Sequence, residues 1–142
     1  MTIHAVIDTN VLVSSMLTKN KGAATARLVE ALIDNRFCPV YNKDILDEYY
    51  EVLSRKEFHF DADVVESLIS IVKDNGLYAE RTSTNDPVID PKDVVFYEVA
   101  LSKDGAYLVT GNLKHFPQKP IVVTPAEMLQ ILEDNGLLED DH

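Results

Sequence analysis

Six side chains that carry oxygen atoms stand where strand and helix patterns of this sequence begin, run or end. They are Asp8, Glu48, Asp90, Asp93, Thr110 and Asn112. Oxygen ligands, mainly carboxylates, are what hard cations such as Mg²⁺ and Mn²⁺ prefer. No cysteine or histidine pair accompanies the set, so it favours Mg²⁺ or Mn²⁺ over Zn²⁺. Carboxylates that converge repel one another, and a cation or a proton must then offset that repulsion.

Asp8 is the most informative of these residues. Residues 3–7 (IHAVI) are typical of a buried strand and the residues after Asp8 of a helix. Asp8 is therefore expected at the carboxyl end of a strand, where open parallel sheets bind ligands. Much later, residues 106–109 (AYLV) repeat the arrangement and lead into Thr110. Two strand ends of one sheet would then face one crevice.

Each candidate also has an interpretation that involves no chemistry. Asp8 could cap the helix that follows it, while Asp90 and Asp93 fit the N-cap and the third position of a later helix. Glu48 alone could be a solvated helix residue, and residues 110–112 alone could be an ordinary turn. The order and spacing of the whole set, more than any single member, indicate a site.

The elements that must position these residues alternate along the chain. Apolar periodicity predicts helices over 11–17, 22–35, 43–55, 61–75, 90–100 and 125–133, and strands over 3–7, 37–41, 78–80, 106–109 and 121–123. Asn42 and Thr124 are expected to cap helices, and Gly76 to end one. In the helix over 61–75 the pattern turns Val64 toward the core. Strands that alternate with helices predict a parallel, right-handed α/β fold.

Composition places the chain among ordinary globular proteins. Of its 142 residues, 46% are hydrophobic and 26% are charged, and the length predicts one domain over 1–135 followed by an acidic tail over 136–142. No signal peptide and no apolar run of about 18 residues is present, so we expect no membrane association. The single cysteine, Cys38, excludes an internal disulfide framework and indicates a cytoplasmic location.

The net charge of −11 argues against broad electrostatic capture of nucleic acid, which needs a surplus of lysine and arginine. Two interpretations remain. Either the substrate is not a polyanion, or the acids are concentrated where divalent cations neutralise them and a few basic residues act locally.

Four motifs together resemble the PIN domain, and more narrowly the branch that contains toxins of prokaryotic toxin–antitoxin systems. The motifs are VIDTNVL (6–12), LDEYYEVL (46–53), DPKDVVFYEVA (90–100) and YLVTGNLKHF (107–116). This resemblance covers nearly the whole chain, and it implies a three-layer α/β/α sandwich with a central parallel sheet. It also implies a ribonuclease that depends on Mg²⁺ or Mn²⁺, and thus a hydrolase.

The resemblance assigns the site residues position by position. Asp8, Glu48 and Asp93 match the three acids of the family and would bind the metal. Asp8 and Asp93 would be its main ligands, while Glu48 would ligate directly, through water, or accept a proton. Asn112 takes the fourth catalytic position, where many members have aspartate, and this departure lowers the negative charge and could leave one metal ion in place of two.

Other residues are expected to support these four. Thr9 and Thr110 would orient waters or a phosphate oxygen, Asn10 would brace the turn between strand and helix, and Asp90 would stand beside the ligands. The nearest basic candidates for backbone phosphates are Lys19, Lys21, Lys114 and His115.

The resemblance also implies partners: an RNA substrate, a small antitoxin protein that presents arginine or lysine to the acids, and a second copy of the chain in a homodimer or higher oligomer. Helical apolar positions that look exposed, including Tyr49 and Tyr50, would contribute to such contacts.

Two alternatives remain beside the nuclease. A PIN-like binding module without turnover is one, favoured by the acidic charge and by Asn112. The other is an aspartyl-phosphate phosphatase or receiver domain, which also begins with an aspartate after the first strand. The phosphatase pattern needs a second acid where this chain has Asn10, and both need a lysine where it has residues 110–112.

Overall fold

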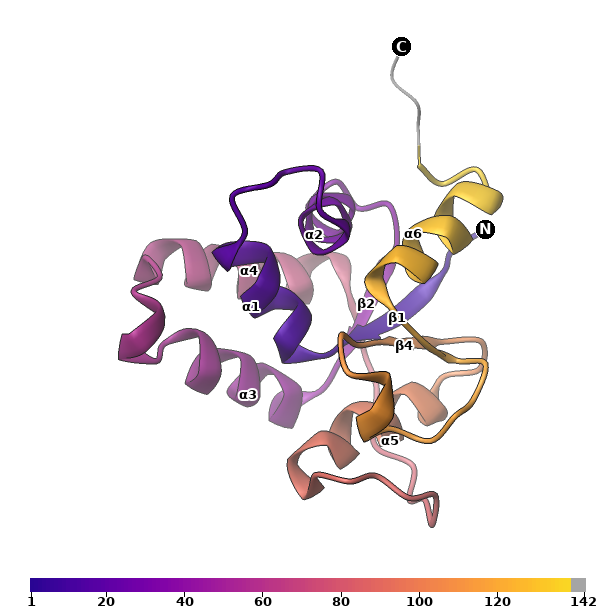
Figure 1. Ribbon diagram of the computed structural model, residues 1–142. Coiled ribbons are helices and arrows are strands. Elements are labelled where there is room, and N and C mark those ends of the chain that lie inside the picture. Colours follow the sequence, from indigo (N-terminus) through magenta and orange to yellow (C-terminus); the bar gives the residue numbers. More distant parts are fainter. Residues whose placement is uncertain (139–142) are drawn as a thin grey trace.

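Five parallel strands form the central sheet of the protein in a computed structural model that describes residues 1–138 (Figure 1). The strands are β1 (His4–Ile7), β2 (Cys38–Tyr41), β3 (Leu77–Tyr78), β4 (Tyr107–Val109) and β5 (Val122–Val123). Every neighbouring pair is parallel, as the sequence predicts. Of the acidic tail expected over 136–142, residues 139–142 lie outside the described part.

The order of the strands in the sheet is β3-β2-β1-β4-β5. The chain therefore moves from β1 to one edge of the sheet, returns across it, and continues from β4 to the other edge. The order reverses between β1 and β4, and in open α/β sheets such a reversal creates a crevice at the carboxyl ends of the two strands.

Helices lie on both faces of the sheet, so the fold is the expected three-layer α/β/α sandwich. They are α1 (Thr9–Leu17), α2 (Ala24–Ile33), α3 (Lys43–Leu53), α4 (Ala62–Asn75), α5 (Val94–Ser102) and α6 (Pro125–Asp134). Three short 3₁₀ turns join them: η1 (Lys56–Phe58), η2 (Pro91–Asp93) and η3 (Leu113–His115). The helix predicted from residue 90 thus begins as the 3₁₀ turn η2. It becomes an α-helix at Val94, directly after Asp93 (φ −85°, ψ −14°).

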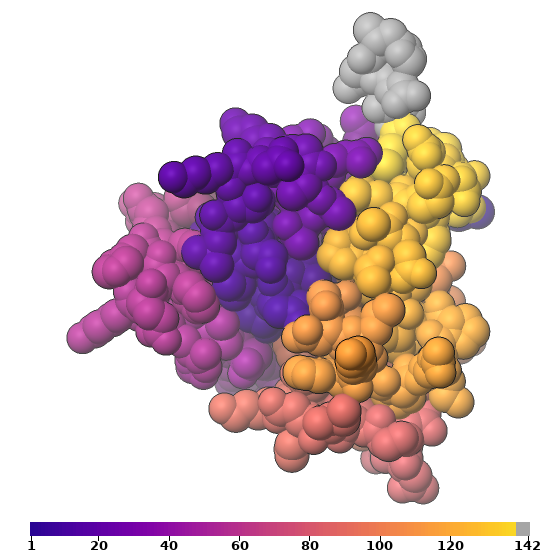
Figure 2. Space-filling model, viewed as in Figure 1, coloured from indigo at the N-terminus to yellow at the C-terminus, as the bar shows by residue number. Residues whose placement is uncertain are grey.

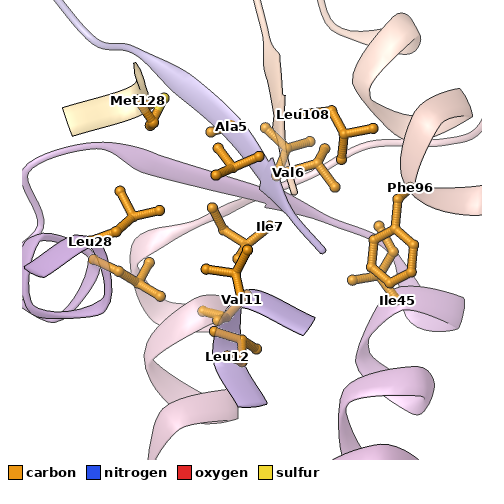
Figure 3. Close-up of a cluster of buried hydrophobic side chains, with 14 of the residues drawn as sticks. Ala5, Val6, Ile7, Val11, Leu12, Leu28, Ile45, Phe96, Leu108 and Met128 are labelled. Carbon is orange, nitrogen blue, oxygen red and sulfur yellow. The ribbon is translucent and has the colours of Figure 1, made fainter. Parts of the chain in front are cut away.

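The core is built around β1, which is buried on both sides. Figure 3 shows its side chains between Leu28 and Met128 on one side and Ile45 and Phe96 on the other. Because β1 is covered on both faces, Ala5, Val6 and Ile7 form a buried apolar run without alternation after the partly buried His4. The polar residue that follows this run therefore stands out.

Local signals for the helix ends are largely confirmed. The Asn42 side chain caps α3, and Thr124 forms a capping box with Glu127 at the start of α6. Gly76 ends α4 as predicted, although its φ of −103° is not left-handed. A Cβ there would lie 2.5 Å from the carbonyl oxygen of Pro39, so glycine is needed for the close approach of α4 to β2.

The prediction that Val64 faces the core is wrong, since this side chain is 52% exposed. The buried face of α4 is formed by Val65, Leu68, Ile69 and Val72. Val64 lies outside this face. Among residues 1–138, no helix has the length and apolar character needed to cross a membrane.

Candidate active site at the carboxyl edge of the sheet

The register of the sheet brings Asp8 and Thr110 together. Ile7 of β1 pairs with Val109 of β4, so the next residue of each strand is a polar one and the two are neighbours. The Thr110 hydroxyl donates a hydrogen bond of 2.9 Å to the Asp8 carboxylate, and both residues are buried. Two parts of the chain separated by 102 residues therefore meet at the crevice that the strand order creates.

Asp8 stands at the N-cap position of α1, yet its side chain caps no backbone N–H. The carboxyl group is directed to Thr110 and remains only 5% exposed. Burial raises the pKa of Asp8 to about 6, and the negative charge of Asp93 contributes to the rise, while the Thr110 hydrogen bond opposes it. The backbone N–H groups of Thr9 and Asn10 at the start of α1 also lower this pKa, so the carboxyl group is held mainly by Thr110 and makes no capping hydrogen bond.

Asp93 lies at the junction of η2 and α5 and is partly buried. Burial and the charge of Asp90 raise its pKa, and His115 partly offsets this effect. The Nδ1 atom of His115 is 3.5 Å from Oδ2 of Asp93. Asp93 and His115, which were assigned separate roles from the sequence, thus form a pair.

Glu48 is partly buried on α3, and burial followed by the charge of Glu51 raises its pKa. The charge of Asp93 adds slightly to this rise, while Lys92 and Arg55 oppose it. The next residue, Tyr49, is buried and donates a hydrogen bond of 2.6 Å to the carbonyl oxygen of Ile7. The expectation that Tyr49 is exposed is therefore wrong, because its hydroxyl anchors α3 to the end of β1; Tyr50 is 41% exposed.

Short polar contacts fix the turn around Asp8. Thr110 accepts a hydrogen bond from the N–H of Asn112, and Asn10 accepts one of 3.1 Å from the N–H of Gly111. Asn10 thus links the start of α1 to the loop after β4. The hydroxyl of Thr9 is buried and has no hydrogen-bond partner among the described residues, which leaves one polar atom without a partner next to Asp8.

The remaining candidates lie around this centre or away from it. Asp90 is exposed and caps η2 by accepting from the N–H of Lys92. Lys114 is exposed on η3, beside His115. Lys19 and Lys21 are different, because they follow α1 and therefore lie at its far end, away from the carboxyl end of β1 (Figure 1). The structure does not bring these two lysines to the crevice.

Among the described residues, the acidic side chains of the site do not form a complete metal centre by themselves. Within residues 1–138, no three acidic, histidine or cysteine side chains are grouped closely enough to form a ready ligand set. The donors are nevertheless of the right chemistry, since Asp8, Glu48 and Asp93 supply hard oxygen ligands. Their raised pKa values include mutual repulsion, which a divalent cation would offset. The chemistry of these donors suits Mg²⁺ or Mn²⁺, while their positions within residues 1–138 do not form a ready ligand set.

Sequence reasoning missed Glu98, which is buried on α5. It accepts hydrogen bonds from the Arg81 guanidinium and from the N–H of Thr84, so it fastens the loop that leads to η2. Tyr97 adds a second fastening through a hydrogen bond of 2.6 Å to Asp86. The available signal was one charged residue within the apolar helix sequence VVFYEVALS.

Comparison with known proteins gives a match to one family model and to no individual protein or structure. Neither the curated proteins nor the solved structures contain a significant match to this chain. The family model described as PIN domain matches residues 4–114, from β1 into η3, and this range includes Asp8, Glu48, Asp93 and Asn112. Because the match covers most of the chain and the sheet has the parallel architecture expected of that family, the chain belongs to the PIN-domain family.

Proposed function

We propose that this protein is a ribonuclease that hydrolyses RNA phosphodiester bonds with the help of Mg²⁺ or Mn²⁺ and serves as the toxin of a toxin–antitoxin pair. PIN domains are generally nucleases, and typically metal-dependent ribonucleases. The finer statements about this chain rest on its own residues at the edge between β1 and β4.

One observation carries the proposal. Asp8 occupies a helix N-cap position without capping, is buried, and faces the charge of Asp93. A buried carboxylate costs free energy even where one hydroxyl is bonded to it, and this cost is explained if the group is kept for binding a cation.

The residues divide the work as follows. Asp8 and Asp93 are the main metal ligands and Glu48 is the third, directly or through water. When bound, Mg²⁺ or Mn²⁺ supplies a water of lowered pKa and stabilises negative charge on phosphoryl oxygens. The Thr110 hydroxyl holds the Asp8 carboxylate in one orientation, and the unpaired Thr9 hydroxyl and Asn112 are available to orient a water or a phosphate oxygen.

The direct test combines metal binding with RNA cleavage. Calorimetric titration with Mn²⁺ should show saturable binding that Asp8→Asn and Asp93→Asn each weaken. A labelled single-stranded RNA should be cleaved by the wild type in Mn²⁺ and not in chelator. The matched control is Asp104→Asn, an exposed carboxylate just before β4 and hence at the opposite edge of the sheet. Equal binding and cleavage by all four proteins would refute the assignment.

A PIN-like binding module without turnover remains the second candidate. It is favoured by the lack of a ready three-ligand set within residues 1–138 and by Asn112 at the fourth position. This candidate predicts RNA binding that does not yield product in Mn²⁺ or Mg²⁺. An aspartyl-phosphate mechanism has less support, since Asn10 binds the N–H of Gly111 and Thr110 is buried at the place where a lysine would be needed.

The proposed partners are an antitoxin and a second copy of the chain, both in the cytoplasm. Apolar side chains are exposed on three helices, at Leu17 of α1, Ile33 of α2 and Val64 of α4. Ile33 and Val64 border a hollow of about 380 Å³ between these helices, which is a surface suited to helix packing. Light scattering of the wild type and of Ile33→Asp tests self-association, and a monomer at all micromolar concentrations would contradict it.

A further inference from the structure

The acidic residues of the chain are unevenly distributed. The sequence contains 24 aspartates and glutamates, yet none occurs from Gly105 to Ala126, where Lys114 and Lys119 are the charged residues. This segment forms β4, η3 and β5. In a protein with a net charge of −11, this segment therefore carries basic side chains and no acidic ones, and in Figure 2 it is the orange area beside the indigo surface of the N-terminal segment.

This segment contains a hollow of about 420 Å³ between η3 and the start of β5. The residues that line it are Leu113, Lys114, Phe116, Pro117, Gln118, Lys119 and Val122. Its wall is mostly apolar, while the polar groups are two ammonium groups and one amide. Lys114, Gln118 and Lys119 are all exposed, so a ligand can reach them.

The hollow and the candidate active site share one element. Lys114 lines the hollow, and its neighbour His115 lies 3.5 Å from Asp93 on the side of the acids. Three residues before η3, Thr110 binds Asp8. The backbone carbonyl of His115 also accepts a hydrogen bond from the N–H of Ile89, which holds η3 against the loop before η2. The hollow therefore begins at Lys114, the residue next to the histidine that contacts Asp93.

A nucleotide fits this combination of groups. A base has apolar faces and a polar edge, which correspond to the apolar wall and to the Gln118 amide, a group that both donates and accepts. The phosphates on either side of a base correspond to Lys114 and Lys119. A base that is paired and stacked in a duplex cannot enter such a hollow, so the strand must be single.

We propose that the hollow lined by Lys114, Gln118 and Lys119 binds one nucleotide of a single-stranded RNA, next to the bond that is cleaved at the acidic site. This inference rests on the proposed function and adds a position for one nucleotide of the substrate. It makes Lys119 a contact to the phosphate backbone and Gln118 a contact to the base.

The first experiment measures binding of a fluorescein-labelled single-stranded RNA of mixed sequence by anisotropy. Ca²⁺ replaces Mn²⁺, and a gel verifies that the RNA stays intact. Lys119→Ala should weaken binding roughly fivefold near 0.1 M salt and reduce the slope of log affinity against log salt by about 0.7. The matched control is Lys73→Ala, an exposed lysine in the last turn of α4 that does not line the hollow, and it should leave both quantities unchanged.

The second experiment addresses the base. Gln118→Ala should change the relative affinities for uridine, cytidine and adenosine oligonucleotides without changing the salt slope, since the amide carries no charge. A purely structural role for residue 118 would instead lower the melting temperature and weaken all three affinities alike. Melting curves of each variant accompany the binding data for this reason.

The outcomes separate this inference from the nuclease proposal. If Lys119→Ala and Lys73→Ala give the same affinity and salt slope, the nucleotide site is refuted even where the wild type cleaves RNA. If the predicted differences occur but Mn²⁺ yields no product, the nucleotide site stands and the nuclease fails. Equally tight binding of a duplex of the same length, or failure of the wild type to bind RNA at all, would also overturn the inference.

Discussion

Three junctions at the carboxyl edge of the sheet, each leading from a strand to a helix, have similar local sequences and different uses. After β2, Asn42 accepts a hydrogen bond of 2.9 Å from the N–H of Ile45 and caps α3. After β5, Thr124 and Glu127 form both bonds of a capping box. After β1, Asp8 has the chemistry and the position of a cap but caps nothing.

The difference comes from what lies beside each junction. The register between β1 and β4 places the hydroxyl of Thr110 within hydrogen-bond distance of Asp8, and the charge of Asp93 acts on the same carboxylate. The carboxylate is therefore held by residues distant in sequence and is not used by its own helix. A cap residue that does not cap is a sign that the side chain serves another purpose, and this contrast can be tested.

The largest effect is expected on RNA cleavage. Asp8→Asn should reduce the rate roughly 1,000-fold, the scale of losing one preorganised electrostatic group, since an amide is a poor ligand for a hard cation. Asn42→Ala should leave the rate within a few-fold at a temperature where both variants are folded. Single-turnover cleavage of a labelled RNA in Mn²⁺ measures both. Similar rates for the two variants would mean that the two junctions do not differ in function.

The next effect concerns pH in the absence of metal. The pKa of Asp8 is about 6 in the folded protein against an ordinary value of 3.8, so the folded state holds this proton more tightly than the unfolded chain. The contribution of Asp8 to the free energy of unfolding therefore falls by roughly 3 kcal/mol as the pH rises from below 4 to above 6.

Urea unfolding in chelator between pH 4 and 8 checks this, with Asp8→Asn as the reference that lacks the titrating group. The difference in the free energy of unfolding between wild type and variant should decrease with rising pH and become constant above about pH 7. A difference that does not depend on pH would show that the Asp8 carboxyl is not desolvated as the structure indicates.

A smaller effect separates the junctions by stability alone. Asn42→Ala and Thr124→Ala should each lower the free energy of unfolding by about 1 kcal/mol, because each removes a side chain that satisfies a backbone N–H. Asp8→Asn in chelator at pH 7.5 should leave it unchanged or raise it, since the variant removes a buried charge that faces Asp93. A clear loss of stability in Asp8→Asn would make Asp8 a structural residue after all.

These expectations also show what the sequence could reveal. The caps at Asn42 and Thr124 depend on residues two or three positions away, so local pattern was enough to predict them. The buried run of β1 ends on Asp8 in the sequence as in the structure, and the three-layer sandwich with its parallel sheet was predicted correctly.

The strand pattern predicted that Asp8 and Thr110 meet at one crevice, but several individual side-chain contacts between distant residues were not predicted. The bond from Tyr49 to the carbonyl of Ile7 joins residues 42 positions apart, and an apolar pattern cannot tell that a tyrosine hydroxyl has a buried acceptor. The fastening of Arg81 by Glu98 is of the same kind, with 17 positions between them. Whether Asp8 caps α1 is likewise decided by the pairing of β1 with β4, which one local segment does not encode.

The smallest expected effect concerns Asn112, the residue by which the fourth position departs from many PIN domains. Its backbone N–H binds the Thr110 hydroxyl that holds Asp8, and the residue itself is exposed. Asn112→Asp adds a hard anionic ligand without changing the size of the side chain, so it should tighten Mn²⁺ binding several-fold and could admit a second ion about 4 Å from the first.

Calorimetry gives both the affinity and the number of ions, and Asn112→Ala is the control that removes the side chain without adding charge. If the position tunes the metal site, the aspartate variant binds most tightly and the alanine variant no more tightly than the wild type. Identical titrations of all three proteins would show that residue 112 lies outside the metal site and that Asp8, Glu48 and Asp93 act without it.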